Sequence, residues 1–160
     1  MATRLKPKAA ALYDQDFYVW TRDQAAATRA GRWVDLDVEH LAEEVEDLKS
    51  EQRAAVRSRV RTIIEHLLKL QVSPAEEPCH GWRRTFRTGR QGIRDRLATT
   101  IRNEIESDLQ ELYDDARANA VDSLLMFGEG EATTALLTTC PYTLEQILGD
   151  WLPDEPGRDD

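Results

Sequence analysis

The spacing of apolar residues along the chain predicts helices throughout. The longest uninterrupted pattern runs over residues 37–72, which contain neither proline nor glycine. Steps of three and four between apolar positions place them on one helix face. We therefore predict one very long amphipathic helix over 37–72, with a bend or a change of packing partner near Gln52, where the step changes. The face comprises Val38, Leu41, Val45, Leu48, Val56, Val60, Ile63, Leu67 and Leu70.

The start of this long helix carries capping signals. Asp37 can cap the first turn, and Leu36 and Leu41 occupy the two positions of a hydrophobic staple. Glutamates in the first two turns complement the positive end of the helix dipole. Pro74 and Pro78 are predicted to end the helix, and a loop is expected to follow.

The same periodicity predicts three further principal helices, of which two precede residue 106. One begins near Pro7, carries apolar residues from Tyr13 to Ala27 and stops at Gly31. Another begins after the loop through Gly81 and spans residues 82–105, although two glycines weaken its first half.

The last part of the chain contains two possible capping boxes. Ser107 with Gln110 predicts the start of a fourth helix, which Gly128 closes. Thr143 with Gln146 predicts a short C-terminal helix ending at residue 149, stapled by Tyr142 and Ile147. The expected fold is an all-α bundle of four principal helices plus this short one, forming a single domain over 1–152 with a disordered tail at 153–160.

Six sequence motifs occur in order along nearly the whole chain. They are YDQDFYVW at 13–20, AGRWVDLDVEHLAEEVEDL at 30–48, EHLLKLQ at 65–71, Trp82-Arg83, YDDAR at 113–117 and CPYTLEQIL at 140–148. Together they resemble the bacterial family known as domain of unknown function twenty-nine. The resemblance implies an all-helical fold and no established activity. The chain departs from the family pattern at Leu70 and at residues 107–109, which affects the boundary between the third and fourth helices.

Composition narrows the classes of function. The net charge of -9 disfavours a general nucleic-acid or membrane-surface binder, because a polyanion is repelled by the overall field. No stretch resembles a signal peptide or a membrane span, so a cytoplasmic location is expected. Cys79 and Cys140 are far apart in sequence and fit reduced thiols rather than a disulfide framework.

Arginines form the first candidate binding surface. Seven of them lie between Gly81 and Arg102 against one aspartate, and more lie between Arg53 and Lys69. If two antiparallel helices bring these stretches together, they repel unless an anion or an acidic partner neutralises them. The acidic segment 35–51 is the expected partner, within the chain or from a second copy. The candidate anion or partner surface consists of Arg83, Arg84, Arg87 and Arg90.

Trp82 and Phe86 interleave with these arginines as stacking residues for single-stranded nucleic acid would. Their four-residue spacing is more typical of a helix face that packs in the core.

Glu44, Asp47 and His66 are the candidates for a metal site. Glu44 and Asp47 are spaced to reach one cation, but in one straight helix Glu44 and His66 lie about 33 Å apart. Structural roles are therefore expected for Glu44 and His66, each paired beside the apolar stripe. Cys79 and His80, preceded by Glu77, are expected to be ordinary loop residues.

No nucleophile elbow, phosphate loop, zinc pattern or dinucleotide fingerprint occurs in the sequence. The sequence predicts a non-enzymatic protein-interaction module in the cytoplasm, without a cofactor and without membrane association. We expect a twofold homodimer that pairs the acidic half of the long helix with the basic half of its partner. A nucleic-acid or anion-binding module is the first alternative, and a metal-dependent enzyme is the second.

Overall fold

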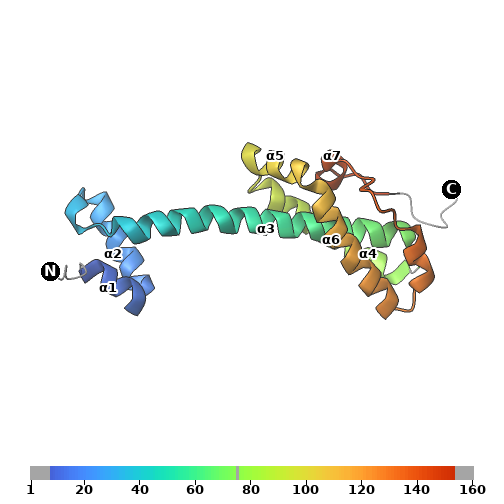
Figure 1. Cartoon of the computed structure of the whole chain (residues 1–160), viewed down its shortest axis with the longest axis horizontal. Coiled ribbons are helices and arrows are strands. Elements are labelled where there is room, and N and C mark those ends of the chain that lie inside the picture. The colour runs from blue at the N-terminus through green and yellow to red at the C-terminus, as the bar shows by residue number, and fades with distance from the viewer. Residues whose placement is uncertain (1–7, 75, 154–160) are drawn as a thin grey trace. The chain divides into compact units, whose positions relative to one another are not determined.

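The structure, a computed structural model, describes residues 8–74 and 76–153 and confirms the all-α class (Figure 1). Within these ranges there are seven α-helices, two short 3-10 helices and no strand. The elements are α1 (Lys8–Gln15), α2 (Phe17–Arg29), η1 (Trp33–Asp35), α3 (Val38–Val72), α4 (Glu76–Arg94), α5 (Thr99–Ser107), α6 (Leu109–Met126), η2 (Gly130–Ala135) and α7 (Leu144–Leu148).

The chain divides into two compact units, Met1–Glu51 and Gln52–Asp160. The division falls inside α3, which is helical without interruption from Val38 to Val72. The long helix is therefore confirmed, and its packing partners change at Gln52 as the apolar pattern predicted. The expectation of one domain over 1–152 stays a prediction.

The first unit contains α1, α2, η1 and the beginning of α3. The prediction of one helix from Pro7 to Gly31 is wrong, because the described part of this segment forms two helices that meet at Asp16. The Asp16 carboxylate accepts a hydrogen bond from the Val19 N–H at 3.0 Å and so caps α2. Gly31 stops the second helix as expected, with a φ of 66° that favours glycine.

The core of the second unit forms around the C-terminal half of α3 (Figure 1). Val60, Ile63 and Leu67 are fully buried, together with residues of α4, α5, α6 and α7. A Cβ on Gly89 would lie 3.5 Å from Ile63, so α4 approaches α3 closely at this glycine. The ring of Trp82, earlier in α4, lies 6.3 Å from that of His66, later in α3. These contacts show that α3 and α4 form an antiparallel hairpin.

The predicted third helix is two helices. Helix α4 begins at Glu76, before the expected loop through Gly81, because Pro78 lies in its first turn, where proline is tolerated. Helix α4 ends at Arg94, and α5 begins at Thr99. The Arg96 carbonyl between them accepts hydrogen bonds from Gln52 Nε2 at 2.9 Å and from the Ala98 N–H at 3.0 Å. Such tertiary contacts satisfy the backbone at the break, and the local sequence does not reveal them.

The capping box predicted at Ser107 and Gln110 is absent. Ser107 ends α5, and Asp108 precedes α6 without a side-chain capping bond. The Gln110 side chain instead forms hydrogen bonds to the segment that follows η2. Its Nε2 donates to the Thr138 carbonyl at 3.1 Å, and its Oε1 accepts from the Cys140 N–H at 3.0 Å. The tertiary contact thus replaces the local one.

The second capping box is confirmed. Thr143 Oγ1 accepts from the Gln146 N–H at 3.2 Å, and Gln146 Oε1 accepts from the Thr143 N–H at 2.8 Å. Tyr142 and Ile147, the predicted staple, are both buried. Of the predicted tail, Pro153 is buried and residues 154–160 lie outside the described residues. A search of the described helices finds none that is both long and apolar enough to cross a membrane.

Candidate functional sites

The arginines predicted to form a surface on α4 differ in their burial. Arg90 is buried, and its guanidinium donates to the carbonyls of Ile147 at 2.9 Å, Gln146 at 3.1 Å and Trp151 at 2.8 Å. Burial lowers the pKa of Arg90 from its usual value. Arg90 therefore holds the C-terminal segment and does not face solvent.

Two of the four predicted arginines remain on the described surface. Arg84 and Arg87 are exposed, and the side chain of Arg83 lies outside the described residues. The aromatic residues between them are not a stacking surface, because Phe86 is buried and Trp82 packs partly buried against the core. Of the four predicted arginines, Arg84 and Arg87 are therefore the ones whose described side chains can form an anion surface on α4.

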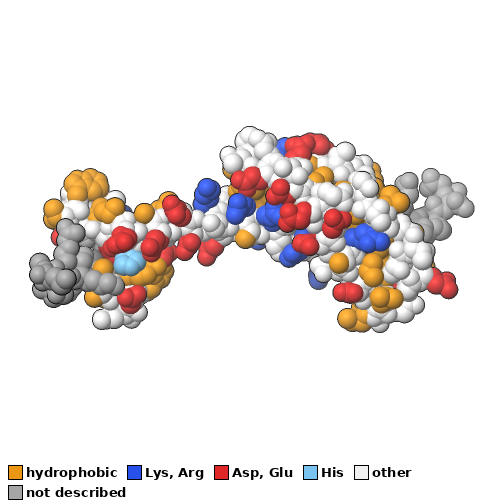
Figure 2. Space-filling view, in the orientation of Figure 1, with side chains coloured by type: hydrophobic (Ala, Val, Ile, Leu, Met, Phe, Trp, Pro, Cys, Tyr) orange, Lys and Arg blue, Asp and Glu red, His pale blue; other side chains and the backbone are white. Residues whose placement is uncertain are grey.

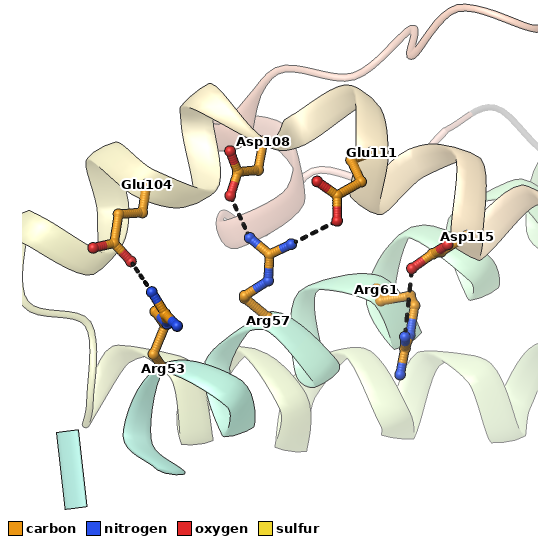
Figure 3. Close-up of polar contacts among 7 residues, drawn as sticks. All are labelled: Arg53, Arg57, Arg61, Glu104, Asp108, Glu111 and Asp115. Carbon is orange, nitrogen blue, oxygen red and sulfur yellow. Dashed lines mark hydrogen bonds and ion pairs between the residues drawn. The ribbon is translucent and has the colours of Figure 1, made fainter. Parts of the chain in front are cut away.

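Arg53, Arg57 and Arg61 of α3 point toward acidic residues of α5, α6 and the junction between them, as Figure 3 shows. Arg57 bonds to Asp108 through one nitrogen and to Glu111 through the other, the latter at 3.1 Å. Two flanking pairs extend this ladder along α3, Arg53 with Glu104 at 3.8 Å and Arg61 with Asp115 at 3.6 Å.

The predicted neutralisation of these α3 arginines by segment 35–51 within the chain is therefore wrong. The four-residue steps of Arg53, Arg57 and Arg61 match the acidic residues along α5 and α6, a signal present in the sequence but missed. An open groove of about 740 Å³ lies beside this ladder, lined by Arg53, Arg57, Asn103, Glu104, Ser107 and Asp108. Its arginines already face carboxylates, so it offers no unpaired cation to an anionic ligand.

The EHLLKLQ motif of α3 builds a buried polar cluster. The Lys69 ammonium bonds to Glu65 Oε1 at 2.7 Å, approaches Ser123 Oγ at 3.5 Å, and lies 5.6 Å from the centre of the Trp82 ring. Lys69 is only 6% exposed, so this pairing is needed to keep its charge inside the unit. The sequence analysis counted Lys69 in the basic stretch 53–69 and did not predict its burial.

His66 lies beside this cluster between two aromatic rings. The centres of the Trp82 and Phe86 rings are each 6.3 Å from that of His66. Its Nδ1 is buried and has no hydrogen-bond partner among the described residues. Burial and the nearby Lys69 ammonium lower the pKa of His66 to about 4, so the ring is neutral at pH 7. The expected polar pairing of this histidine is therefore not found within the described part of the chain.

A second polar network joins the helices of the first unit. The buried Asp37 carboxylate accepts from Trp20 Nε1 at 3.3 Å and bonds to His40 Nδ1 at 2.7 Å. The Tyr13 ring stacks on the His40 ring at 4.0 Å, and its hydroxyl donates to Glu44 Oε1 at 2.7 Å. This bond gives Glu44 the pairing expected from its position. Asp37 directly precedes α3, and its carboxylate links α2 to the start of that helix.

The metal-site candidates belong to different parts of the chain. Glu44 and Asp47 lie in the first unit, and His66 lies in the second. Across 8–74 and 76–153, no three His, Cys, Asp or Glu side chains are grouped so as to hold a metal ion. Cys79 and His80 belong to α4, so their predicted place in a loop is wrong, and their side chains lie outside the described ones.

The first half of α3 exposes the apolar stripe that the sequence predicted would be covered. Val38 is 66% exposed, Val45 is 65% exposed and Leu48 is 64% exposed. Hydrophobic side chains gather elsewhere over the same unit in Figure 2, and Phe17, Tyr18, Trp33 and Val34 are among its exposed apolar residues. We call Val38, Leu41, Val45 and Leu48 the apolar α3 face; Leu41 is half-buried, and the exposure of the other three departs from the expected burial.

Comparison with protein families matches residues 12–152 to a model described as Domain of unknown function DUF29. The chain belongs to this family, which has no assigned function. A similar solved structure is an alpha-helical protein of unknown function from Rhodospirillum rubrum ATCC 11170. It is 24% identical, with a TM-score of 0.65 over 86% of this chain and 89% of that one. This likeness supports the fold. No curated protein matches the chain.

Proposed function

We propose that this chain is a non-enzymatic protein-interaction module whose contact surface is the apolar α3 face. The observation that carries the proposal is the exposure of Val38, Val45 and Leu48 at helical spacing on one element. A continuous apolar helix face in water is costly, and in other proteins such faces mark sites of protein contact. The cytoplasm is the compartment we propose for this contact.

The alternatives receive less support from the geometry. On α4, Arg90 is bonded to internal carbonyls and cannot join a nucleic-acid or anion surface, and Arg53, Arg57 and Arg61 of α3 face carboxylates. A metal-dependent enzyme would need Glu44 and Asp47 to act with His66, which belongs to the other unit. The interaction role requires neither arrangement.

Affinity capture from the native cell tests the proposal with three tagged proteins. These are the unchanged chain, the Val45→Glu variant and a Leu125→Glu control, which places the same charge on an exposed leucine of α6. The proposal expects partners that the unchanged chain and the control retain and that Val45→Glu loses. Identical recovery by all three proteins would exclude the α3 face as the contact surface.

A further inference from the structure

We infer that the occupant of the apolar α3 face is a second copy of the same face, aligned parallel and in register as a short two-stranded coiled coil over residues 38–51. This inference rests on the proposed function and names its partner. It also replaces the pairing of acidic and basic helix halves, because Arg53, Arg57 and Arg61 already pair with acidic residues between 104 and 115.

The residue types at the face select this arrangement. In a heptad repeat with positions a to g, Val38 and Val45 occupy position a, and Leu41 and Leu48 occupy position d. A β-branched residue at the first position with leucine at the fourth favours parallel pairs of helices, since this combination packs best between two strands. Helix α2 contacts Asp37, which precedes α3, and α1 contacts His40 and Glu44 of α3. Val38, Val45 and Leu48 remain exposed, and Leu41 is half-buried.

The charges beside the face agree with a parallel pair. Glu44 and Lys49 flank the core positions on opposite sides and are five residues apart, the separation at which side chains meet across a parallel coiled coil. Glu44 uses Oε1 to bond Tyr13, and Lys49 has no ion-pair partner within the described residues. Each dimer therefore gains two Glu44–Lys49 pairs related by the twofold axis.

An antiparallel pair would lose this complementarity. It brings like flanking positions together, so Glu44 and Glu51 of one helix would face the same glutamates of the other. Four apolar layers without a longer seam give a modest interface, and the association should depend on protein concentration in the micromolar range. Because the core contacts are apolar and uncharged, most of the dimerisation affinity should remain at high salt.

Sedimentation equilibrium over a concentration series tests the association with the purified full chain. The unchanged protein and the Leu125→Glu control should dimerise alike, and Leu48→Glu should weaken dimerisation by at least about 100-fold, because it buries an unpaired charge in both helices. Leu48 is exposed within the chain, so circular dichroism should show unchanged helix content. A monomeric unchanged protein, or equal weakening by both variants, would overturn the inference.

Disulfide trapping tests the direction. In a Cys79→Ser/Cys140→Ser background, Leu48→Cys chains should cross-link to each other under mild oxidation, because residue 48 meets its own copy only in a parallel, in-register pair. Preferential cross-linking of Val38→Cys chains to Leu48→Cys chains would indicate an antiparallel pair and overturn the inference.

Charge variants test the flanking pairs. Lys49→Glu and Glu44→Lys should each weaken dimerisation by about tenfold, since each replaces two attractive pairs by repulsive ones. An equimolar mixture should regain the affinity of the unchanged protein, since both cross-pairs become attractive again. No recovery in the mixture would contradict the Glu44–Lys49 contact.

The two proposals can fail separately. If the purified chain stays monomeric while Val45→Glu still loses partners captured from cells, the second copy is excluded and the interaction function stands. If capture is also insensitive to Val45→Glu, both proposals fail.

Discussion

Both halves of α3 carry an apolar stripe at helical spacing, but the stripe is buried in the C-terminal half and largely exposed in the N-terminal half. In the second unit Val56, Val60, Ile63 and Leu67 are each 0% exposed, whereas in the first unit Val38, Val45 and Leu48 are each about two-thirds exposed. In both halves the apolar residues recur at steps of three and four positions. Apolar periodicity thus identifies which face of a helix seeks cover, but it does not identify what provides the cover.

The difference follows from what the chain supplies to each half. Helices α4, α5 and α6 enclose the C-terminal half of α3 with their own apolar residues, including Phe86, Ile93, Ile105 and Leu112. The N-terminal half receives α1 and α2 on a polar side, through Asp37, His40 and Glu44. One half of the helix is therefore a core element, and the other presents a surface.

The largest expected effect separates the two halves by mutation. Leu67→Ala should cost about 2 to 5 kcal/mol of unfolding free energy at every protein concentration, because it leaves a cavity in a fully buried site. Leu48→Ala should cost less than about 0.5 kcal/mol in dilute protein, because Leu48 is exposed within the chain. Urea denaturation at several protein concentrations measures both. Equal costs in dilute protein would contradict the contrast.

In the second unit the buried guanidinium of Arg90 also contributes to the fold, because it bonds the C-terminal segment to α4. Arg90→Met should cost about 3 kcal/mol, since it leaves the carbonyls of Gln146, Ile147 and Trp151 without their donor. Arg94→Met is the matched control. Arg94 pairs with the almost fully exposed Asp150, so its loss should cost less than about 0.5 kcal/mol. Similar melting curves for the two variants would show that Arg90 does not hold the C-terminal segment.

His66 adds a pH dependence to the second unit. With a pKa lowered to about 4, the folded state disfavours the charged ring, while the unfolded chain binds a proton near pH 6.5. Stability from this group is complete above pH 6.5 and falls as the pH drops toward 4, by about 2 kcal/mol at pH 5. Urea denaturation at pH 8 and pH 5 should show this loss, and His66→Gln should reduce it. An unchanged pH dependence in the variant would exclude His66 as its source.

Local signals in the sequence predicted local structure well. The Thr143 capping box, the stop at Gly31 and the long unbroken α3 depend on neighbouring residues, and each is confirmed. Gln110 also carried a local signal, but its side chain bonds residues 138 and 140, which fold back beside it. Capping rules alone cannot predict the outcome of that competition.

The candidate site residues were predicted less well, because burial depends on distant segments. Arg90 resembles its exposed neighbours in sequence, and only the docking of residues 146–151 makes it internal. Lys69 is likewise buried by Trp82 and Ser123, from two other helices. The exposed apolar α3 face was missed for the opposite reason, because the sequence pattern implies burial without specifying whether the same chain provides it.

The smallest expected effect is at His40, whose pH dependence is opposite in sign to that of His66. The hydrogen bond to Asp37 is the main cause that raises the pKa of His40, so the folded first unit favours the protonated ring. Its contribution to stability is complete below the ordinary histidine pKa and is lost as the pH rises through the raised value. In an NMR titration of the full chain, the His40 ring should titrate above pH 6.5 and the His66 ring well below it. Asp37→Asn should move the His40 midpoint downward and leave that of His66 unchanged, because the two rings belong to different units. A His40 midpoint unmoved by this substitution would mean that the Asp37 contact does not set its charge.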